Sequence, residues 1–420
     1  MPFTKPRGIR LERKKESGLL NTLKRPYAVK RVRVPLLGGS VPCVKEGDHV
    51  HLGQKIADPK GPDSVPVYAS LAGRIEKITV TRLSDGQECT CAEILSEGES
   101  KQAQFAETKK DGEGLSKEEI LNTFRERGLL SADPGMEPVH AKIRKNAPVR
   151  TIVMKCCEPE PYTTSGQVLL ASHPVEILKG TDLLKKAAGA EKAVLVFEDA
   201  NREEYELIKS KIYLLKWNGY EAEMVPSVYP PYHEDLWRRK LSGGVMTWNI
   251  PTAYAAYEAV YLRKPFFERV VTVGGECVAE PRNLWLPFGF SFQDAVQACK
   301  GFLREPRKVL SGGPMTGTAQ AGLDVPVTAG TNAILALPGQ VARETEEKPC
   351  IRCNRCVDTC PVSISPAMIA LAAESGEFQA AEEWGARDCI ECGVCGYVCP
   401  SEKNMAKWIR LAKEKTGGAK

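Results

Sequence analysis

The sequence predicts a multidomain α/β protein, and three observations lead to this prediction. A chain of 420 residues, 42% of them hydrophobic, is long enough for about three domains with buried cores. Strand and helix patterns alternate between about residues 149 and 225, which is typical of a parallel sheet. Two cysteine runs with the same spacing lie near the C-terminus, and they predict a small separate domain there.

Residues 1–34 are predicted to form a basic N-terminal arm. They hold eleven Lys or Arg against Glu12 and Glu16, a local balance of +9 in a chain whose net charge is +5. Such a segment is expected either to dock an acidic partner or an anionic membrane surface, or to be a solvated tail. Nucleic acid is not expected as a partner, since no binding motif accompanies the charge.

Residues 35–95 contain short strand patterns separated by glycine-containing turns. The phrase VKEGDHVHLGQKIAD, followed by VPVYASLAGRIEKI, resembles the barrel-sandwich hybrid of biotinyl and lipoyl carriers. Those carriers expose a modifiable lysine at a hairpin tip, whereas the equivalent tip here, 67–71, has none. The segment is therefore interpreted as an unmodified structural module.

Residues 116–264 are predicted to form a Rossmann-like α/β domain, after a charged linker at 96–115. Ser116 and Glu119 have the spacing of a capping box, which opens a helix that continues to about Arg127. The following pattern predicts strands at 149–155, 193–197 and 222–225 and helices at 174–188 and 202–215. A parallel sheet of this kind places a crevice at the carboxyl ends of its strands.

Residues 265–345 are strand-rich again and are predicted to form a small β domain. Strands are expected at 268–273, 283–287 and 308–310, with a helix at 292–299. Gly312 and Gly313 follow the last strand and are interpreted as a structural turn.

Residues 347–415 contain eight of the fifteen cysteines in two runs of the form C-x2-C-x2-C-x3-C-P. This is the spacing of bacterial ferredoxins with two 4Fe–4S clusters, in which the last cysteine of each run ligates the other cluster. The predicted ligands are Cys350, Cys353, Cys356 and Cys399 for cluster 1, and Cys389, Cys392, Cys395 and Cys360 for cluster 2. Short helices are expected at 366–373 and 378–383, and a final amphipathic helix at 405–415.

Structural zinc and disulfides are the alternatives for these cysteines. Zinc usually takes two close pairs of ligands, which fits three cysteines within seven residues poorly. The N-terminus shows no secretory signal and no run reaches about 18 apolar residues, so a cytoplasmic protein without a transmembrane segment is expected. Its thiols would stay reduced there. The adjacent Cys156 and Cys157 are noted as a second candidate for redox activity.

The order of these parts resembles the C subunit of the Rnf electron-transport complex, the RnfC family, over nearly the whole chain. The most specific stretches are EPEPYTTS, HPVEILKG, ERVVTVGG, VLSGGPMTG, DVPVTAGTNAILAL and the two cysteine runs. The resemblance implies that 265–345 is a β-grasp-like (SLBB) domain. It also implies that the α/β domain is similar to the flavoprotein subunit of complex I, which binds FMN and NADH and passes electrons to the clusters.

The chain departs from the family at a glycine-rich loop before the first strand of the α/β domain. The family has the form G-I-V-G-L-G-G-A-x-F-P-T-H-x-K, and its glycines fall here on Ser131, Asp133 and Pro134. A loop that cradles phosphate needs glycine's backbone freedom and free N–H groups, and proline supplies neither. We therefore expect a divergent member whose flavin site is weakened or lost.

Other positions of the family's flavin site are retained. Glu158 and Glu160 match its E-x-E-P-Y-x-T stretch, and Asn249 matches part of its N-N-V-G-T stretch, although Pro251 replaces the glycine. These three residues are the candidates for a residual FMN or NADH site. Glu198 and Asp199 end a strand where an acid could hold ribose hydroxyls, or they are ordinary surface acids.

Three functions are consistent with the sequence. The first is an RnfC-like electron-transfer subunit that relays electrons through two 4Fe–4S clusters between redox partner proteins. The second is an NADH-oxidising subunit in which FMN feeds the clusters. The third is a non-catalytic assembly module. The expected partners are other subunits of a redox complex and a ferredoxin- or flavin-type electron donor or acceptor, with peripheral association at the inner face of the cell membrane left open.

Overall fold

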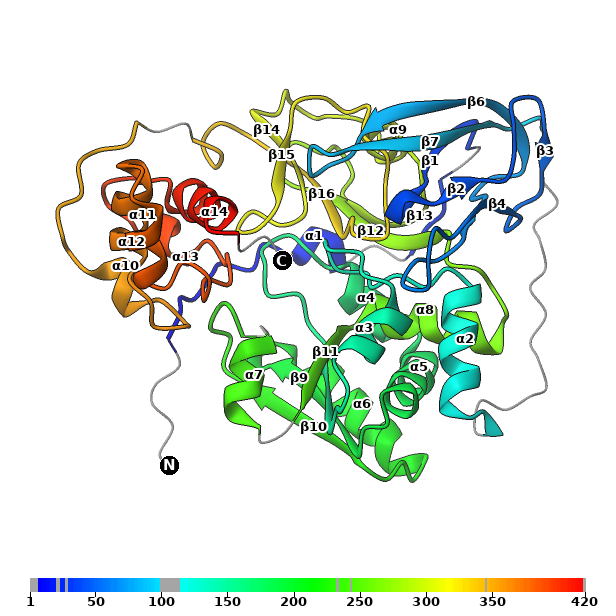
Figure 1. Ribbon diagram of the computed structural model, residues 1–420, viewed down its shortest axis with the longest axis horizontal. Helices are drawn as coiled ribbons and strands as arrows, with labels where there is room; N and C mark the ends of the chain where they lie inside the picture. The colour runs from blue at the N-terminus through cyan, green and yellow to red at the C-terminus, as the bar shows by residue number, and fades with distance from the viewer. Residues whose placement is uncertain are drawn as a thin grey trace.

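The computed structural model describes residues 7–19, 23–26, 29–98, 114–231, 234–241, 244–343 and 346–417. Figure 1 shows four folded parts. The barrel and the second β domain lie side by side, the α/β domain packs below them, and the cysteine-rich domain lies at one end. The multidomain α/β fold predicted from the sequence is confirmed. Most of the predicted linker at 96–115 lies outside the described residues.

The N-terminal barrel consists of two small antiparallel sheets. One has the strand order β1-β7-β6-β3 and the other the order β2-β4-β5. The strands are β1 (Arg31–Pro35), β2 (Val41–Pro42), β3 (His49–Val50), β4 (Lys55–Asp58), β5 (Val67–Tyr68), β6 (Gly73–Arg82) and β7 (Glu88–Leu95), with a short helix η1 (Leu37–Gly39). In β1, Val32 and Val34 are buried while the arginines beside them are not. Since β1 includes residues 31–34, the end of the segment expected to be an arm belongs to the barrel.

The hairpin tip that carries lysine in carrier domains is packed against the rest of this chain. β5 pairs with β4, and the Ser70 hydroxyl donates to the carbonyl oxygen of Phe288 at 2.5 Å. The Tyr68 hydroxyl also donates to the carbonyl oxygen of Glu126. These contacts fix the barrel against both neighbouring domains.

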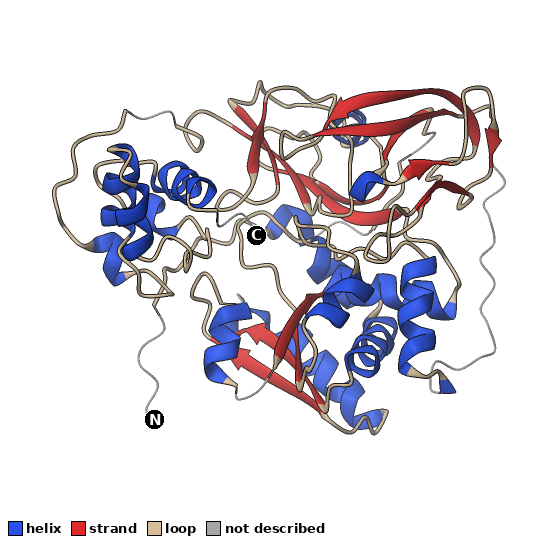
Figure 2. Ribbon diagram, viewed as in Figure 1, coloured by secondary structure: helices blue, strands red, loops and turns tan. Residues whose placement is uncertain are grey.

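The α/β domain is built on a parallel sheet of order β10-β9-β8-β11. The strands are β8 (Thr151–Lys155), β9 (Lys192–Glu198), β10 (Tyr220–Val225) and β11 (Val245–Asn249). The helices are α2 (Lys117–Glu126), α3 (Val139–Lys145), α4 (Ser165–Ser172), α5 (Pro174–Ala188), η3 (Asp199–Asn201), α6 (Arg202–Leu214), α7 (Glu234–Lys240) and α8 (Ile250–Tyr261). Figure 2 shows helices on both sides of this sheet. The predicted capping box is present, because Ser116 accepts from the Glu119 amide while Glu119 accepts from the Ser116 amide.

Strand β11 and helices α3, α4, α7 and α8 were not predicted from the sequence. Helix α8 gives the clearest reason. Its residues from Ile250 to Val260 are all buried, so the helix has no polar face and no amphipathic pattern. Gly180 of α5 lets the backbone of α8 approach closely, since a Cβ there would overlap the carbonyl of Ala253.

The second β domain has a five-stranded sheet of order β13-β12-β16-β14-β15. Its elements are β12 (Glu268–Gly274), β13 (Arg282–Pro287), α9 (Phe292–Ala298), β14 (Lys308–Ser311), β15 (Thr318–Gln320) and β16 (Ala333–Leu337). Four of these lie within two residues of their predicted bounds, and β15 and β16 were not predicted. One hydrophobic core continues from this sheet into the α/β domain, so the two pack as one body.

The cysteine-rich domain is small and helical. Its helices are α10 (Arg355–Asp358), α11 (Pro366–Glu374), α12 (Phe378–Glu383), α13 (Val394–Tyr397) and α14 (Met405–Lys415). Ile369, Met405 and Ile409 are buried in its core, and Cys389, Cys395 and Cys399 pack against that core. Among the described residues, no helix has the length and apolar character needed to cross a bilayer.

Candidate functional site

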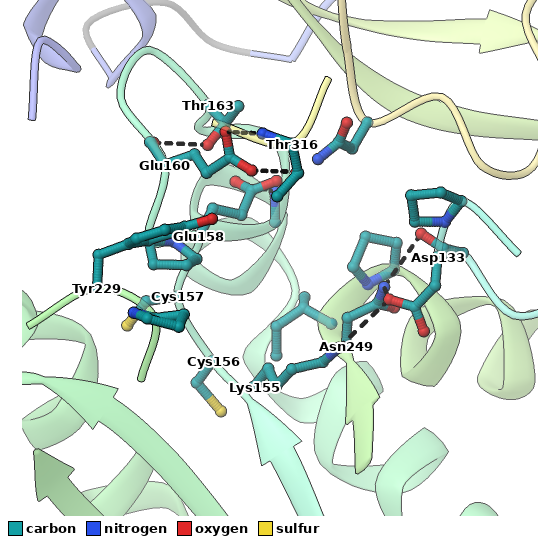
Figure 3. Close-up of a pocket in the computed structure, with 18 of the residues that line it drawn as sticks. Asp133, Lys155, Cys156, Cys157, Glu158, Glu160, Thr163, Tyr229, Asn249 and Thr316 are labelled. Atoms are coloured by element: carbon teal, nitrogen blue, oxygen red, sulfur yellow. Dashed lines mark hydrogen bonds and ion pairs between the residues drawn. The ribbon is translucent and has the colours of Figure 1, made fainter. Parts of the chain in front are cut away.

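A cavity of about 340 Å³ opens where strands β8 and β11 end. This is the crevice expected at the carboxyl edge of a parallel sheet. Its size is within the range of about 300–1,000 Å³ that is usual for small-molecule sites. The lining residues come from the loop at 132–134, the segment after β8, the loop around Tyr229, the start of α8 and the second cysteine run. Figure 3 shows this cavity.

Glu158 lines the cavity, but its carboxylate caps a helix. Its two oxygens accept hydrogen bonds from the Ser165 hydroxyl at 2.8 Å and from the Gly166 amide at 2.9 Å. These groups belong to the first turn of α4, where backbone N–H groups lack partners within the helix. The polar atoms of Glu158 are therefore already used to position α4.

Glu160 lines the same cavity and holds the loop after β14. Its carboxylate accepts from the amide of Met315 at 2.7 Å, from the amide of Thr316 at 3.3 Å and from the Thr316 hydroxyl. Burial raises the pKa of Glu160, and these hydrogen bonds oppose the rise. Gly313 lies directly against the carboxylate, so the Gly312-Gly313 turn has the structural role expected from the sequence.

Asn249 ends β11 and caps α8. Its side-chain oxygen accepts from the amide of Thr252 at 3.0 Å and from the Thr252 hydroxyl at 2.7 Å. Its side-chain nitrogen donates to the carbonyl of Ala132 at 3.1 Å and to the carboxylate of Asp133 at 2.9 Å. The structure thus brings all three predicted residues, Glu158, Glu160 and Asn249, to one cavity, with each bonded to its own chain.

Asp133 points into the cavity and forms an ion pair at its edge (Figure 3). Its carboxylate lies 3.3 Å from the Lys155 ammonium, at the end of β8. Burial opposes ionisation, but Lys155, Lys142 and Arg269 outweigh it and lower the pKa of Asp133 below its ordinary value of 3.8. The cavity therefore contains an ionised carboxylate that is already paired.

Arg269 is a site residue that the sequence did not reveal. It is buried in β12 and donates to the carbonyl oxygens of Ala132, at 3.1 Å, and of Ala329. Burial lowers its pKa to about 10. The arginine stands in the apolar stretch ERVVTVGG, which reads as a core strand, so no local signal marks it as part of a cavity.

The described part of the N-terminal arm packs against its own chain beside this cavity. Lys15 is 3% exposed and donates to the carbonyl oxygen of Glu158, and burial lowers its pKa. Lys14 pairs with Glu276 at 2.9 Å, and Arg13 donates to the carbonyl of Ala200 at 2.9 Å. Docking of the arm to a partner stays a prediction, whereas the expectation of a solvated tail is wrong for these three residues. Their partners lie far along the chain, and sequence reasoning could not pair them.

Glu198 and Asp199 lie at the end of β9 but outside the lining of the cavity. Glu198 is buried, which raises its pKa, while Lys15 and Arg13 oppose the rise. Asp199 is exposed and accepts from the amide and the hydroxyl of Ser227. Glu198 is thus not the surface acid that one of the two expectations described.

Cys156 and Cys157 are buried and line the cavity. Their thiols have different partners, since that of Cys156 donates to the carbonyl of Met154 and that of Cys157 accepts from the amide of Glu198. Figure 3 shows the two sulfur atoms pointing in different directions. This arrangement does not place them as a dithiol pair.

A second, smaller cavity lies within the cysteine-rich domain. Cys360, Cys389, Cys392 and Cys395 all line it, together with apolar side chains such as Val394. Burial raises the pKa of Cys389 and Cys395 and raises that of Cys392 to about 11, so these thiols would be protonated until a metal displaced the protons. The last cysteine of the first run is therefore beside the first three cysteines of the second run.

At the other run, Cys356 lies near Cys399, the last cysteine of the second run. Burial raises the pKa of Cys356, and the nearby Cys399 adds to the rise. Throughout the described part of the chain, no three His, Cys, Asp or Glu side chains converge closely enough to hold a single metal ion. In a 4Fe–4S cluster each of four thiolates binds a different iron. The two sets of four cysteines supply the thiolate donors that two 4Fe–4S clusters would need.

The two cavities share a wall. Ile390 and Cys392 line both of them. The Tyr229 hydroxyl, from the loop after β10, donates to the carbonyl oxygen of Cys392 at 3.0 Å. The second cysteine run is thus seated directly on the cavity of the α/β domain.

Comparison with known proteins matches all four parts. Residues 3–99 match the RnfC barrel sandwich hybrid domain, 125–257 the Nuo51 FMN-binding domain, 270–319 the SLBB domain and 343–400 the 4Fe-4S dicluster domain. The C subunit of the proton-translocating ferredoxin:NAD(+) oxidoreductase complex of Clostridium ljungdahlii is 30% identical over 395 residues, which cover 90% of this chain and 85% of the relative. The C subunit of the Na(+)-translocating ferredoxin:NAD(+) oxidoreductase complex of Acetobacterium woodii is 30% identical over 390 residues, covering 89% and 87%. A solved NAD+-reducing NiFe hydrogenase chain aligns at 17% identity with a TM-score of 0.47, covering 71% of this chain and 61% of that one.

Proposed function

The chain belongs to the RnfC family, and from that premise we propose that it is an electron-transfer subunit of a redox complex, with a weakened flavin site. The relatives are named as parts of ferredoxin:NAD(+) oxidoreductase complexes that translocate protons or Na(+). We infer that this chain likewise works beside other subunits and exchanges electrons with partner proteins. Because ion translocation takes place across a membrane, we place the chain at the inner face of the cell membrane as a peripheral subunit.

The residues that would hold two 4Fe–4S clusters are the two crossed sets of cysteines. Cys350, Cys353, Cys356 and Cys399 would hold one, and Cys389, Cys392, Cys395 and Cys360 the other. A 4Fe–4S cluster supplies one-electron oxidation and reduction at a potential set by its surroundings. The observation that best supports this assignment is that Cys360 lines the same small cavity as the three cysteines of the other run.

The chain's own residues bring the second cysteine set close to the cavity of the α/β domain. Ile390 and Cys392 form part of the cavity wall, and Tyr229 fixes the backbone of Cys392. Apolar side chains such as Val394 and Ile409 line the smaller cavity beside this cysteine set. An electron carrier bound in the larger cavity would lie next to this set.

The weakened flavin site is inferred from Asp133 and Pro134. The Asp133 carboxylate is directed into the cavity and is bonded to Asn249 and Lys155. A flavin phosphate placed there would meet a negative charge, and Pro134 has no N–H to offer it. Both residues therefore oppose binding of FMN through its phosphate.

The alternative is an NADH-oxidising subunit that binds FMN. It is favoured by the match of residues 125–257 to an FMN-binding domain and by a cavity of adequate size. NADH-dependent bleaching of the purified protein's visible absorption would support this alternative. An unchanged spectrum with NADH and added FMN would contradict it.

The deciding experiment measures iron and flavin in protein purified without oxygen. We expect about eight irons per chain, four for each cysteine set, and FMN well below one per chain. The Cys360→Ser variant should lose about half of the iron, whereas the buried Cys299→Ser control should keep it. Stoichiometric FMN in the wild type would contradict the weakened site, and full iron in the Cys360→Ser variant would contradict the ligand assignment.

A further inference from the structure

The two cysteine runs form equivalent loops. Arg352 and Asn354 of the first run occupy the same positions as Glu391 and Gly393 of the second. All four have positive φ, with values of 57° and 60° in the first loop and 53° and 77° in the second. The backbone therefore follows the same course twice, and the surroundings of the two loops can be compared position by position.

The second loop is covered by the rest of the chain. Residues 389–393 are all partly buried. Ile390 and Cys392 face the larger cavity, and the Cα of Gly393 lies so close to Met315 that a Cβ would come within 2.6 Å of its carbonyl oxygen. This loop is thus docked against two neighbouring domains.

The first loop is open to solvent. Residues 351–355 are five consecutive exposed positions, and Ile351 is 66% exposed. Its counterpart in the second loop is Ile390, which lines the cavity wall. An isoleucine is thus exposed at the position that the twin loop uses to contact the rest of the chain.

The charge of the first loop defines the partner. Glu391 of the second loop pairs within its own domain, with Arg410 at 2.9 Å and Lys413 at 2.6 Å. By contrast, within the described part of the chain no carboxylate forms an ion pair with Arg352 or Arg355.

Within the exposed residues 351–355 the charged side chains are Arg352 and Arg355, and this segment contains no Asp or Glu. The surface is therefore basic around an apolar centre. Arginine beside an apolar residue is a combination that is enriched in protein interfaces.

We propose that residues 351–355 are the docking face for an acidic electron-carrier protein. This inference rests on the proposed function and adds to it the side of the subunit on which each cysteine set would exchange electrons. The second cysteine set faces the internal cavity, while the first set faces this exposed surface beside Cys353. The partner is a separate protein with carboxylates around its redox centre, because these would pair with Arg352 and Arg355.

The test measures binding of an oxidised, acidic two-cluster ferredoxin to the iron-loaded protein at low and high ionic strength. Wild-type binding should weaken with salt, and the Arg352→Ser/Arg355→Ser variant should bind about tenfold or more weakly at low salt. Ile351→Ser should also weaken binding, with a smaller dependence on salt. Arg82→Ser, at a side chain that is 73% exposed on the barrel, is the matched control and should bind like the wild type.

Iron content and the visible spectrum of each variant show whether the cysteine sets are intact. If a variant loses iron, the carboxylates of the ferredoxin are amidated instead, and its binding to the wild-type chain is measured. That binding should fall by a similar factor. The docking face, but not the proposed function, would be overturned if the wild type held its full iron and did not bind the ferredoxin. The same holds if neither the arginine variant nor amidation weakened the binding. A wild type that holds far fewer than about eight irons would overturn the proposed function as well.

Discussion

The Tyr229 hydroxyl donates a hydrogen bond to the carbonyl oxygen of Cys392 at 3.0 Å, and it joins the α/β domain to the cysteine-rich domain. Tyr229 is buried, and its backbone exchanges two hydrogen bonds with Ile9 of the N-terminal arm, at 2.8 and 3.1 Å. Burial and the nearby Glu160 raise its pKa, so the phenol stays protonated and remains a donor at neutral pH. Three segments far apart in the sequence therefore meet at this tyrosine.

Tyr229→Phe should loosen the second cysteine set without unfolding the protein. The variant keeps the ring but leaves the Cys392 carbonyl without this donor, which costs about 1 kcal/mol. Iron should therefore be lost to a chelator faster than from the wild type, with an unchanged circular dichroism spectrum. Tyr213→Phe, at a residue that is 83% exposed, is the matched control. Equal rates of iron loss in both variants would show that the hydrogen bond has no role in holding this set.

Gly313→Ala should destabilise the contact between the second β domain and the cavity. A Cβ at this position overlaps the Glu160 carboxylate, which accepts the amides of Met315 and Thr316. Forcing an atom into a packed contact typically costs about 1–3 kcal/mol, which urea denaturation would measure. Gly322→Ala has no atom within 4 Å of the added Cβ and should change stability by less than about 1 kcal/mol. A similar loss in both variants would contradict the close contact.

Lys264→Met should destabilise the protein strongly at neutral pH. Lys264 is 9% exposed at its side chain and pairs with Glu258 at 2.6 Å and with Glu268 at 2.7 Å. Its removal leaves two buried carboxylates without this cation, and breaking a buried pair typically costs about 3–5 kcal/mol in the free energy of unfolding. Lys300→Met removes a lysine whose side chain is 70% exposed and should cost about 1 kcal/mol or less.

The destabilisation by Lys264→Met should shrink as the pH falls. Burial opposes ionisation of Glu268, but Lys264 and Arg25 outweigh it and lower its pKa from 4.5 to about 2. A carboxylate with a lowered pKa stabilises the folded state above pH 4.5 and loses that contribution as the pH falls toward 2. Unfolding followed by tryptophan fluorescence from pH 7 to about pH 3.5 would check the trend. A difference between wild type and variant that stays constant over this range would contradict it.

Local signals in the sequence were sufficient to predict the bounds of elements that begin and end at residues such as proline and glycine. Helix α5 matched its predicted bounds because Pro174 begins it and Gly189, with φ of 69°, follows its end. The cysteine spacing is likewise a local signal, because each run places its four cysteines within eleven residues, 350–360 and 389–399. Helix α8 escaped prediction because it is buried on all sides, and β11 because only its pairing with β8 identifies it.

The candidate site was only partly predictable for a different reason. Glu158, Glu160 and Asn249 were proposed from the family's E-x-E-P-Y-x-T and N-N-V-G-T stretches, and all three do line the cavity. Arg269, Tyr229 and Ile390 reach the same cavity from segments that are distant in the sequence. Their contribution depends on how the domains pack, and no local pattern records that packing.

Restoring glycine in the altered loop should increase FMN binding. Replacing Ser131, Asp133 and Pro134 together by glycine removes the carboxylate that now bonds to Lys155 and Asn249. It also restores an N–H group and backbone freedom beside the cavity. Lys155 would then be available to a phosphate, so we expect FMN affinity to rise by about tenfold or more, which corresponds to about 1.4 kcal/mol.

Equilibrium dialysis against FMN would measure this gain. Ser84→Gly with Asp85→Gly changes a turn of the barrel, at a partly buried and an exposed position, and is the control for added chain flexibility, with no gain expected. If the wild type already bound FMN as tightly as the glycine variant, Asp133 and Pro134 would be compatible with the flavin, and the NADH-oxidising alternative would gain support. A gain confined to the glycine variant would instead show that the three replaced residues keep the cavity from binding FMN, so that electrons would have to enter this subunit from a partner and not from a flavin of its own.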